Sequence, residues 1–378
     1  MVMGVSCCVN CSNSYCLRLF SYQLLSDEPN RAFYICFMKQ KVLLTGVSGF
    51  VGSHTAIQLL EKGYYVTGTL RDMKRADEIR QIIARHTAHI DNLTFAEAEL
   101  SDEKTWLELS RGVDYIQHIA SPFPRVLPKN DDELIIPARA GVLNILKAAS
   151  VNKVKRVVLT SSSGAVLYGK EKGKESGTFD ETVWTDATNL KDTSPYFRSK
   201  TIAERAAWDF IKNDKSGLEL ATVLPGAILG PVLESDFGTS ANIVLKMLDG
   251  SIPALPNIGF DMVDVRSIAN LLILAMEDPN AANERFIGSA GFLSFKDVSA
   301  ILRDKYPGRK IPKLILPDFL TRIFALFDKT LQPVLLDLGK ERIPDTTKAK
   351  RLLHWHPIEN KEAVLSCAES LIGLGLVK

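Results

Sequence analysis

Apolar and polar positions follow one another in two regular rhythms over most of this chain. Short runs rich in apolar and β-branched residues predict strands, and the stretches between them, with apolar positions three and four residues apart, predict helices. Strands are expected over 41–45, 65–69, 93–98, 115–119, 156–160 and 220–224, and helices over 52–62, 75–85, 102–110, 133–150 and 196–213. Strands that alternate with such helices are typical of βαβ units, so the pattern predicts a parallel, doubly wound α/β sheet with helices on both faces.

This rhythm ends after the last of these strands, where Pro and Gly become frequent and shorter elements are expected. One more helix is predicted over 265–276 and one more strand over 285–287. We therefore expect a first domain over 38–225, to which 260–290 return, and a smaller, discontinuous α/β lobe, mostly C-terminal, within 226–378. In open α/β sheets ligands bind outside the carboxyl ends of the strands, so the lobe is expected to form a substrate site there.

Residues 1–37 precede the pattern and are expected to form an unstructured extension, with Met38 as a natural start of translation. They contain five of the 6 cysteines. A secreted disulfide protein would spread its cysteines through its body, so a reducing, cytoplasmic setting is expected. Cys8 and Cys11 have the spacing of half a zinc site, but no second Cys or His pair follows at the usual distance, so no metal site is expected.

Composition narrows the classes of partner. A chain of 378 residues that is 46% hydrophobic and 24% charged has the composition of an ordinary globular protein. Its formal net charge of +2, without a dense run of Lys and Arg, argues against a nucleic-acid or anionic-membrane surface. Apolar stretches such as 271–276 and 371–377 are far shorter than the roughly 20 residues of a membrane span. We expect a monomer or homodimer that binds a small molecule.

A glycine-rich stretch, TGVSGFVG over 45–52, follows the first predicted strand and opens the first helix. Its glycines permit a tight turn and a close backbone approach to a pyrophosphate, while the helix N-terminus supplies N–H donors and partial positive charge. The strand before it and the helix after it indicate a Rossmann-type dinucleotide site. The loop residues expected at the cofactor are Gly46, Ser48, Gly49, Phe50, Val51 and Gly52.

The end of the second predicted strand bears on the choice of nicotinamide cofactor. An NAD site usually places Asp or Glu there, where the carboxylate bonds the ribose 2′-hydroxyl. This chain has Arg71 followed by Asp72, with Lys74 and Arg75 as further cations. Arg71 could bind a 2′-phosphate through two hydrogen bonds, with Lys74 or Arg75 as second cation, so NADPH is expected rather than NADH, although Asp72 argues for the latter.

Tyr196 and Lys200 stand four residues apart at the start of a predicted helix, which puts them on one face. A nearby ammonium favours phenolate, so Lys200 is expected to lower the pKa of Tyr196 and make it a proton donor and acceptor near neutral pH. The strand over 156–160 runs into the serines of 161–163. A hydroxyl at that carboxyl end could hydrogen-bond a reacting oxygen beside Tyr196.

In these motifs the chain over about 39–378 resembles the extended short-chain dehydrogenase/reductase family. It is most similar to the branch of dihydroflavonol reductases, cinnamoyl-CoA reductases and microbial aldehyde or methylglyoxal reductases. The stretches that carry the resemblance are the glycine loop, Arg71-Asp72, HIASP over 118–122, the run over 161–166, Tyr196-x-x-x-Lys200 and PGAILGP over 225–231. DMVDVR over 261–266 and KAKRLLHWHP over 348–357 resemble later landmarks of the family's substrate lobe.

The resemblance implies roles for the catalytic residues. Tyr196 would be the proton donor, and Lys200 its partner, which also binds the cofactor ribose. Ser162 matches the family's catalytic serine because it stands four residues before the valine that closes the run, and Ser163 is the alternative. Asn144 matches a helix asparagine that organises the site through water, or it has a role in helix packing.

The resemblance also places residues around the cofactor. Ala120 would lie against it, and Pro225 with Gly226 would lie near the nicotinamide. Where the family has Asp-Leu after the third strand, at the adenine, this chain has Glu99 and Leu100. The expected activity is the NADPH-dependent reduction of an aldehyde or ketone to an alcohol. The alternatives are a nucleotide-sugar epimerase or dehydratase, a 3β-hydroxysteroid-type dehydrogenase, and a dinucleotide sensor without turnover.

Overall fold

The structure, a computed structural model, describes residues 40–122, 130–235, 237–327 and 334–377. The expected N-terminal extension over 1–37, its cysteines and the proposed start at Met38 lie outside the described residues.

The main sheet consists of seven parallel strands in the order β11-β7-β5-β4-β1-β2-β3. These strands are β1 (Lys41–Thr45), β2 (Tyr65–Leu70), β3 (Leu93–Glu97), β4 (Tyr115–His118), β5 (Arg156–Thr160), β7 (Glu219–Pro225) and β11 (Glu284–Gly288). The strand order reverses between β1 and β4, which is where open α/β sheets bind ligands. The predicted doubly wound, Rossmann-type fold is confirmed.

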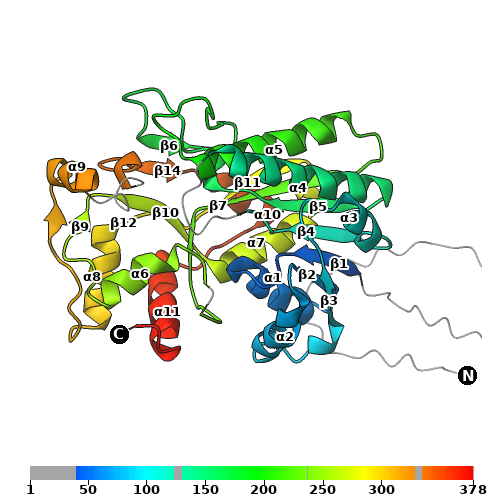
Figure 1. The fold of residues 1–378 in the computed structure, drawn as a ribbon, viewed down its shortest axis with the longest axis horizontal. Helices are drawn as coiled ribbons and strands as arrows, with labels where there is room; N and C mark the ends of the chain where they lie inside the picture. Colours follow the sequence, from blue (N-terminus) through cyan, green and yellow to red (C-terminus); the bar gives the residue numbers. More distant parts are fainter. Residues whose placement is uncertain (1–39, 123–129, 236, 328–333, 378) are drawn as a thin grey trace, which may run out of the picture. The chain divides into compact units, whose positions relative to one another are not determined.

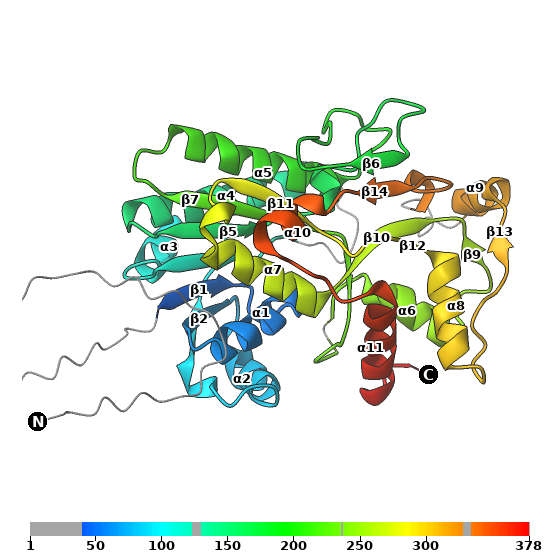
Figure 2. The same ribbon diagram turned by 180° about the vertical axis from the view of Figure 1, so that it is seen from behind.

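Helices cover both faces of this sheet, as Figures 1 and 2 show. One face carries α3 (Glu103–Leu109), α4 (Asp132–Val151) and α5 (Pro195–Asn213), and the other carries α1 (Phe50–Glu61), α2 (Ala76–Ala84) and α7 (Val265–Glu277). Strand β1 shows why both faces need cover. Its Leu43 is buried in the core below α4 and α5, whereas Val42 and Leu44 are buried in the core below α1 and α7.

Helix α4 is, within the part of the chain that the structure describes, the one helix long and apolar enough to cross a membrane by length and composition. Its most apolar window has a mean hydropathy of 1.4, and 50% of that window is buried inside the protein. The buried side, which includes Ile145, Ala148 and Ala149, belongs to the core between α4 and the sheet. Packing in this core accounts for the apolar composition of the helix.

The smaller lobe is built around a three-stranded sheet, β12-β10-β8. Its elements are β8 (Ala227–Leu229), α6 (Ala241–Leu248), β9 (Leu255–Pro256), β10 (Gly259–Asp264), β12 (Phe292–Ser294), α8 (Phe295–Lys305), β13 (Ile315–Leu316), α9 (Asp318–Phe327) and α11 (Asn360–Gly373). A separate apolar core holds α6, α8 and α11 together. A short pair of strands, β6 (Gly177–Phe179) and β14 (Arg342–Pro344), joins distant parts of the chain. Of the predicted return segment 260–290, α7 and β11 join the main sheet, whereas β10 belongs to the small one.

The segment 348–357, which the resemblance assigns to the substrate lobe, instead packs on the main sheet. Helix α10 (Thr347–Leu353) places Leu353 in the core of α1, α2 and α7, and Trp355 follows it into the same core. Trp355 is fully buried, and its indole Nε1 donates to the Ser267 carbonyl of α7 at 3.0 Å. Burial of so large an aromatic ring fixes the return of the chain to the main sheet.

Candidate active site

The glycine loop forms the turn that its sequence predicts. Gly46 has φ +72°, and a Cβ there would lie 3.1 Å from the backbone of Ala120. A Cβ at Gly52 would lie 2.0 Å from the Gly46 carbonyl oxygen, so helix α1 can begin this close to the turn only without a side chain. The Gly49 N–H donates to the Gly46 carbonyl at 3.0 Å and closes the turn. Bare backbone at the start of a helix fits a diphosphate, because both N–H groups and the helix dipole favour an anion.

The side chains of the other loop residues pack against two different parts of the fold, the main sheet and the small lobe. Ser48 is half-buried in the turn, and Val51 packs against the main core. The Phe50 ring packs against the core of the small lobe and meets His54 edge-on at 5.6 Å between ring centroids. The Phe50 and Val51 side chains therefore pack against different apolar cores.

The cations after β2 differ in their surroundings. Arg71 and Lys74 are exposed, and neither forms an ion pair with any residue that the structure describes. The Asp72 carboxylate accepts from the Lys74 N–H at 2.9 Å and caps the 3-10 turn Met73–Arg75. This cap accounts for the acidic residue that argued for NADH. Arg75 is held by two carboxylates, Glu78 at 3.1 Å and Glu234 at 2.7 Å.

A hollow at the carboxyl ends of the strands brings the two halves of the predicted site together. Ala120, which touches Gly46, lines it together with Leu100 and Lys200. The Leu100 carbonyl accepts from the Asn144 side chain at 3.0 Å, so Asn144 fixes the turn after β3 to helix α4. This contact favours the packing role for Asn144. Glu99 is exposed beside the hollow and does not line it.

His118, at the end of β4, also lines the hollow and is neutral. Burial, with a smaller contribution from the Lys200 charge, lowers its pKa to about 3. Its Nδ1 lies 2.9 Å from Thr45 Oγ1, and that oxygen also accepts from the Ala120 N–H at 3.0 Å. A neutral imidazole with this bond orients the turn against Gly46.

Helix α5 positions the tyrosine and the lysine. Ser194 caps it by accepting from the Phe197 N–H at 3.2 Å, and Pro195 occupies its first turn. Tyr196 therefore stands at the helix start, with Lys200 one turn further on. The Tyr196 phenol hydrogen-bonds the Ser162 hydroxyl. The Lys200 ammonium lies 6.0 Å from the centroid of the Tyr196 ring and donates to the Thr160 carbonyl at 3.2 Å.

The predicted lowering of the tyrosine pKa is wrong for this structure. Burial raises the pKa of Tyr196 to about 12, and the Ser162 hydrogen bond only partly opposes it. Burial also lowers the pKa of Lys200 to about 8, opposed by the charge of Glu204. The ammonium is bonded to the strand carbonyl, so burial dominates at the phenol. At neutral pH the phenol is protonated, which suits it to donate a proton.

The two candidate serines face different partners. Ser162 hydrogen-bonds Tyr196, whereas the Ser163 hydroxyl faces Asp261 of β10, whose Oδ2 has no hydrogen-bond partner among the described residues. Burial raises the pKa of Asp261 to about 7. Gly226 lies against the same carboxyl, since a Cβ there would be 2.3 Å from Asp261 Oδ2. Pro225 ends β7 immediately before Gly226. Pro225 and Gly226, which are predicted to lie near the nicotinamide, therefore adjoin Ser163 and Asp261, whereas Ser162 contacts Tyr196.

Glu204 is a site residue that the sequence reasoning missed. It is fully buried, lines the hollow, and stands four residues after Lys200 on the same face of α5. Its carboxylate accepts from Ser161 Oγ at 2.6 Å and from Arg285 Nε at 2.8 Å. Glu204 thus fixes the serine next to Ser162 and supplies negative charge near Lys200. The four-residue spacing after Lys200 was a signal that could have identified it.

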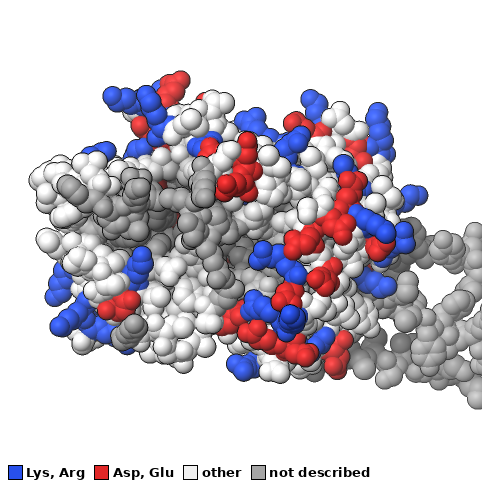
Figure 3. Space-filling view, viewed as in Figure 1, with Lys and Arg blue, Asp and Glu red and all other residues white. Residues whose placement is uncertain are grey.

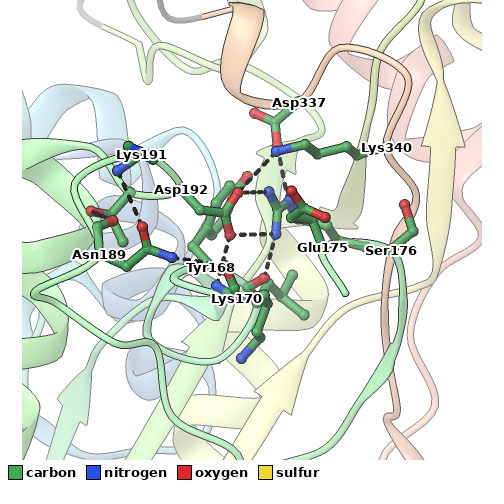
Figure 4. Close-up of polar contacts among 12 residues, drawn as sticks. Tyr168, Lys170, Glu175, Ser176, Asn189, Lys191, Asp192, Asp337 and Lys340 are labelled. Atoms are coloured by element: carbon green, nitrogen blue, oxygen red, sulfur yellow. Dashed lines mark hydrogen bonds and ion pairs between the residues drawn. The ribbon is translucent and has the colours of Figure 1, made fainter. Parts of the chain in front are cut away.

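A buried ionic network, also missed, joins the segment before α5 to residues near β14 (Figure 4). Asp192 pairs with Arg342 and accepts from Lys340 Nζ at 3.0 Å. The Arg342 guanidinium lies 4.4 Å from the centroid of the Tyr168 ring, which stacks on Phe197 at 3.9 Å. Phe197 is the neighbour of Tyr196, so the network supports the start of α5. Asp192 and Arg342 are 150 residues apart in the sequence, so no local pattern reveals their ion pair.

Similarity to known proteins is consistent across sequence and fold. Residues 42–287 match the NAD dependent epimerase/dehydratase family. The chain is 33% identical over 279 residues to a cinnamoyl-CoA reductase of Medicago truncatula, covering 73% of this chain and 84% of that protein. It is 30% identical over 281 residues to a dihydroflavonol 4-reductase of Zea mays, covering 73% and 77%. The solved structure of the yeast methylglyoxal/isovaleraldehyde reductase complexed with NADPH has a TM-score of 0.74 and 27% identity, over 89% of this chain and 100% of that one.

Proposed function

Because this chain belongs to the NAD dependent epimerase/dehydratase family, within the extended short-chain dehydrogenases/reductases, we propose that it reduces an aldehyde or ketone to an alcohol through Ser162, Tyr196 and Lys200. The chain is an oxidoreductase, and NADPH is its cofactor, in keeping with the NADPH complexes of its structural relatives. One observation supports the proposal above all. The hollow beside Gly46 is lined by Lys200, one helical turn from a tyrosine that hydrogen-bonds Ser162.

The residues present fit NADPH. Backbone N–H groups at Phe50 and Val51, in the first turn of α1, would hold the diphosphate, because no Cβ blocks the turn at Gly46 or Gly52. Arg71 and Lys74 would bind the 2′-phosphate, since both are exposed cations after β2. When bound, NADPH supplies the hydride that reduces the carbonyl carbon.

The side chains of the site supply the proton and the positioning. Ser162 would hydrogen-bond the carbonyl oxygen and hold it beside Tyr196. The protonated phenol would then donate its proton to that oxygen as the carbon is reduced, which yields the alcohol and leaves a phenolate. The Lys200 ammonium would stabilise the phenolate, which regains a proton from water. In sum, one carbonyl, one NADPH and one proton give one alcohol and one NADP⁺.

The proposed reaction predicts which cofactor is consumed and with which substrates. Purified protein should oxidise NADPH in the presence of small aldehydes, dicarbonyls or aromatic ketones, and NADH more slowly, as followed by the absorbance of the reduced nicotinamide. Matched mixtures without carbonyl should show no oxidation. Tightly held NAD that never exchanges would instead favour an epimerase or dehydratase. Binding of NADPH without turnover on any carbonyl would favour a sensor and would contradict the proposal.

The rate of reduction should fall in alkaline solution. Burial lowers the pKa of Lys200 to about 8, so its ammonium is present below that pH and lost above it. Without the ammonium the phenolate left by proton donation is not stabilised, so kcat/KM should be level below about pH 7 and fall by about tenfold per unit above about pH 8. The measurement is a pH profile with a non-ionising aldehyde at saturating NADPH, with NADPH affinity determined at each pH as the control. A kcat/KM that stays level up to about pH 10 would show that the charge of Lys200 has no role in the mechanism.

A further inference from the structure

Arg75 differs from the other two cations after β2, Arg71 and Lys74, because it is paired with carboxylates. Its Nη2 donates to Glu234 Oε2 at 2.7 Å and its Nε donates to Glu78 Oε2 at 3.1 Å. Glu78 is a near neighbour in sequence, but Glu234 comes from a segment 159 residues later. The Glu234 side chain is only 15% exposed, against 56% for Glu78. The Arg75–Glu234 pair is therefore the more shielded of the two.

Hydrogen bonds tie the chain just before Glu234 to two helices. The Pro231 carbonyl lies 2.9 Å from His54 Nε2 of α1, and the Val232 N–H donates to Ser370 Oγ of α11 at 2.8 Å. Glu234 also lines a small hollow with Phe50 and Ser53, at the start of α1 and next to the glycine loop. These contacts hold the backbone two and three residues before Glu234, and the ion pair with Arg75 holds its carboxylate, so Glu234 places a negative charge beside the start of α1.

The charges around α2 would make a bound 2′-phosphate compete with Glu234 for Arg75. Basic and acidic side chains lie next to one another on the surface over this helix (Figure 3). Arg71 and Lys74 have no carboxylate partner among the residues that the structure describes. A 2′-phosphate carries about −1.5 to −2 charges near neutral pH, so it would attract all three cations after β2. Arg75 can serve the phosphate only by sharing or leaving the carboxylate of Glu234, which also repels the phosphate as a like charge.

We propose that Glu234 is a cofactor-selectivity residue that weakens binding of the 2′-phosphate by competing for Arg75, and so reduces the preference for NADPH over NADH. The proposal rests on the proposed use of Arg71 and Lys74 by NADPH. It assigns to the small lobe a role in cofactor choice, since Glu234 follows β8 and not β2.

The test compares two ligands that differ only in the 2′-phosphate. Glu234→Gln keeps the size of the side chain and removes its charge. Calorimetry should show that adenosine 2′,5′-bisphosphate binds roughly three- to tenfold more tightly to this variant than to the original protein. Adenosine 5′-monophosphate should bind both proteins equally, within about twofold, and the gain should shrink at high salt because exposed charges are screened.

Two further variants make the result decisive. Glu277→Gln removes the charge that pairs Glu277, at the end of α7, with Lys62 at 2.7 Å, and it should change the binding of neither ligand. Arg71→Gln should weaken the bisphosphate alone. Suppose that Arg71→Gln weakens binding of the bisphosphate alone. The inference about Glu234 is then wrong, and the proposed function stands, if Glu234→Gln leaves bisphosphate binding unchanged, weakens it, or tightens the binding of both ligands alike. If Arg71→Gln changes neither ligand, the proposed 2′-phosphate site itself is wrong.

Discussion

Tyr196→Phe should lower kcat for carbonyl reduction by about 10²- to 10⁴-fold, because it removes the hydroxyl that is the proposed proton donor and keeps the aromatic ring. The ring of Tyr196 lies against Phe197 at 5.7 Å between centroids, and that contact needs no hydroxyl. Affinity for NADPH should therefore change by no more than about twofold. Steady-state kinetics of NADPH oxidation, with cofactor binding measured separately, check both values.

Tyr65→Phe serves as the control for this variant. Tyr65 is 45% exposed at the start of β2, at the end of the strand opposite the glycine loop, so loss of its hydroxyl should leave kcat unchanged. A Tyr196→Phe protein that keeps a third or more of the original kcat would show that another group donates the proton.

Ser162→Ala should lower kcat/KM by about 10²- to 10³-fold, as expected when one donor to a developing oxyanion is removed. The Ser162 hydroxyl is the group that hydrogen-bonds Tyr196, and it also accepts from the Gly164 N–H at 3.1 Å. Its loss would leave the substrate oxygen without a partner beside the phenol.

Ser163→Ala is the matched control, because it deletes the same atom from the next residue. Ser163 faces Asp261, so this variant should lose less than about tenfold in kcat/KM. Thermal unfolding of both variants separates an effect on catalysis from one on stability. A larger loss in Ser163→Ala than in Ser162→Ala would transfer the catalytic role to Ser163.

The main sheet could be predicted from the sequence because its signals are local. In β1 the buried residues are continuous from Val42 to Thr45, as a strand covered on both faces requires, and the glycine loop follows at once. The turn at Gly46 and the tight start of α1 at Gly52 depend on the absence of a side chain, which the sequence displays directly. The four-residue step from Tyr196 to Lys200 likewise needs only a helix.

The remaining features depend on contacts between distant residues. The bond between Glu204 and Arg285 joins positions 81 apart, and Glu234 reaches Arg75 across 159 residues. No periodicity reports such pairs. Trp355 could be recognised as a packing residue, but which core it enters is decided by the path of the chain.

The direction of the tyrosine pKa was beyond the sequence for a different reason. The four-residue spacing brings a positive charge near Tyr196, but it gives neither the burial of the phenol nor the bond from Lys200 to the Thr160 carbonyl. Desolvation and charge act in opposite directions on a phenol, and only the structure shows which is larger.

Transfer of deuterium from the cofactor to the product would show whether the protein catalyses hydride transfer to a carbonyl. The protein is supplied with NADPH that carries deuterium in place of both hydrogens at the reactive ring carbon, together with a carbonyl that it reduces, and the product is analysed by mass spectrometry and NMR. We expect an alcohol with one deuterium on the former carbonyl carbon, formed in step with NADP⁺. An unlabelled alcohol, or an isomerised substrate without net oxidation of NADPH, would contradict it.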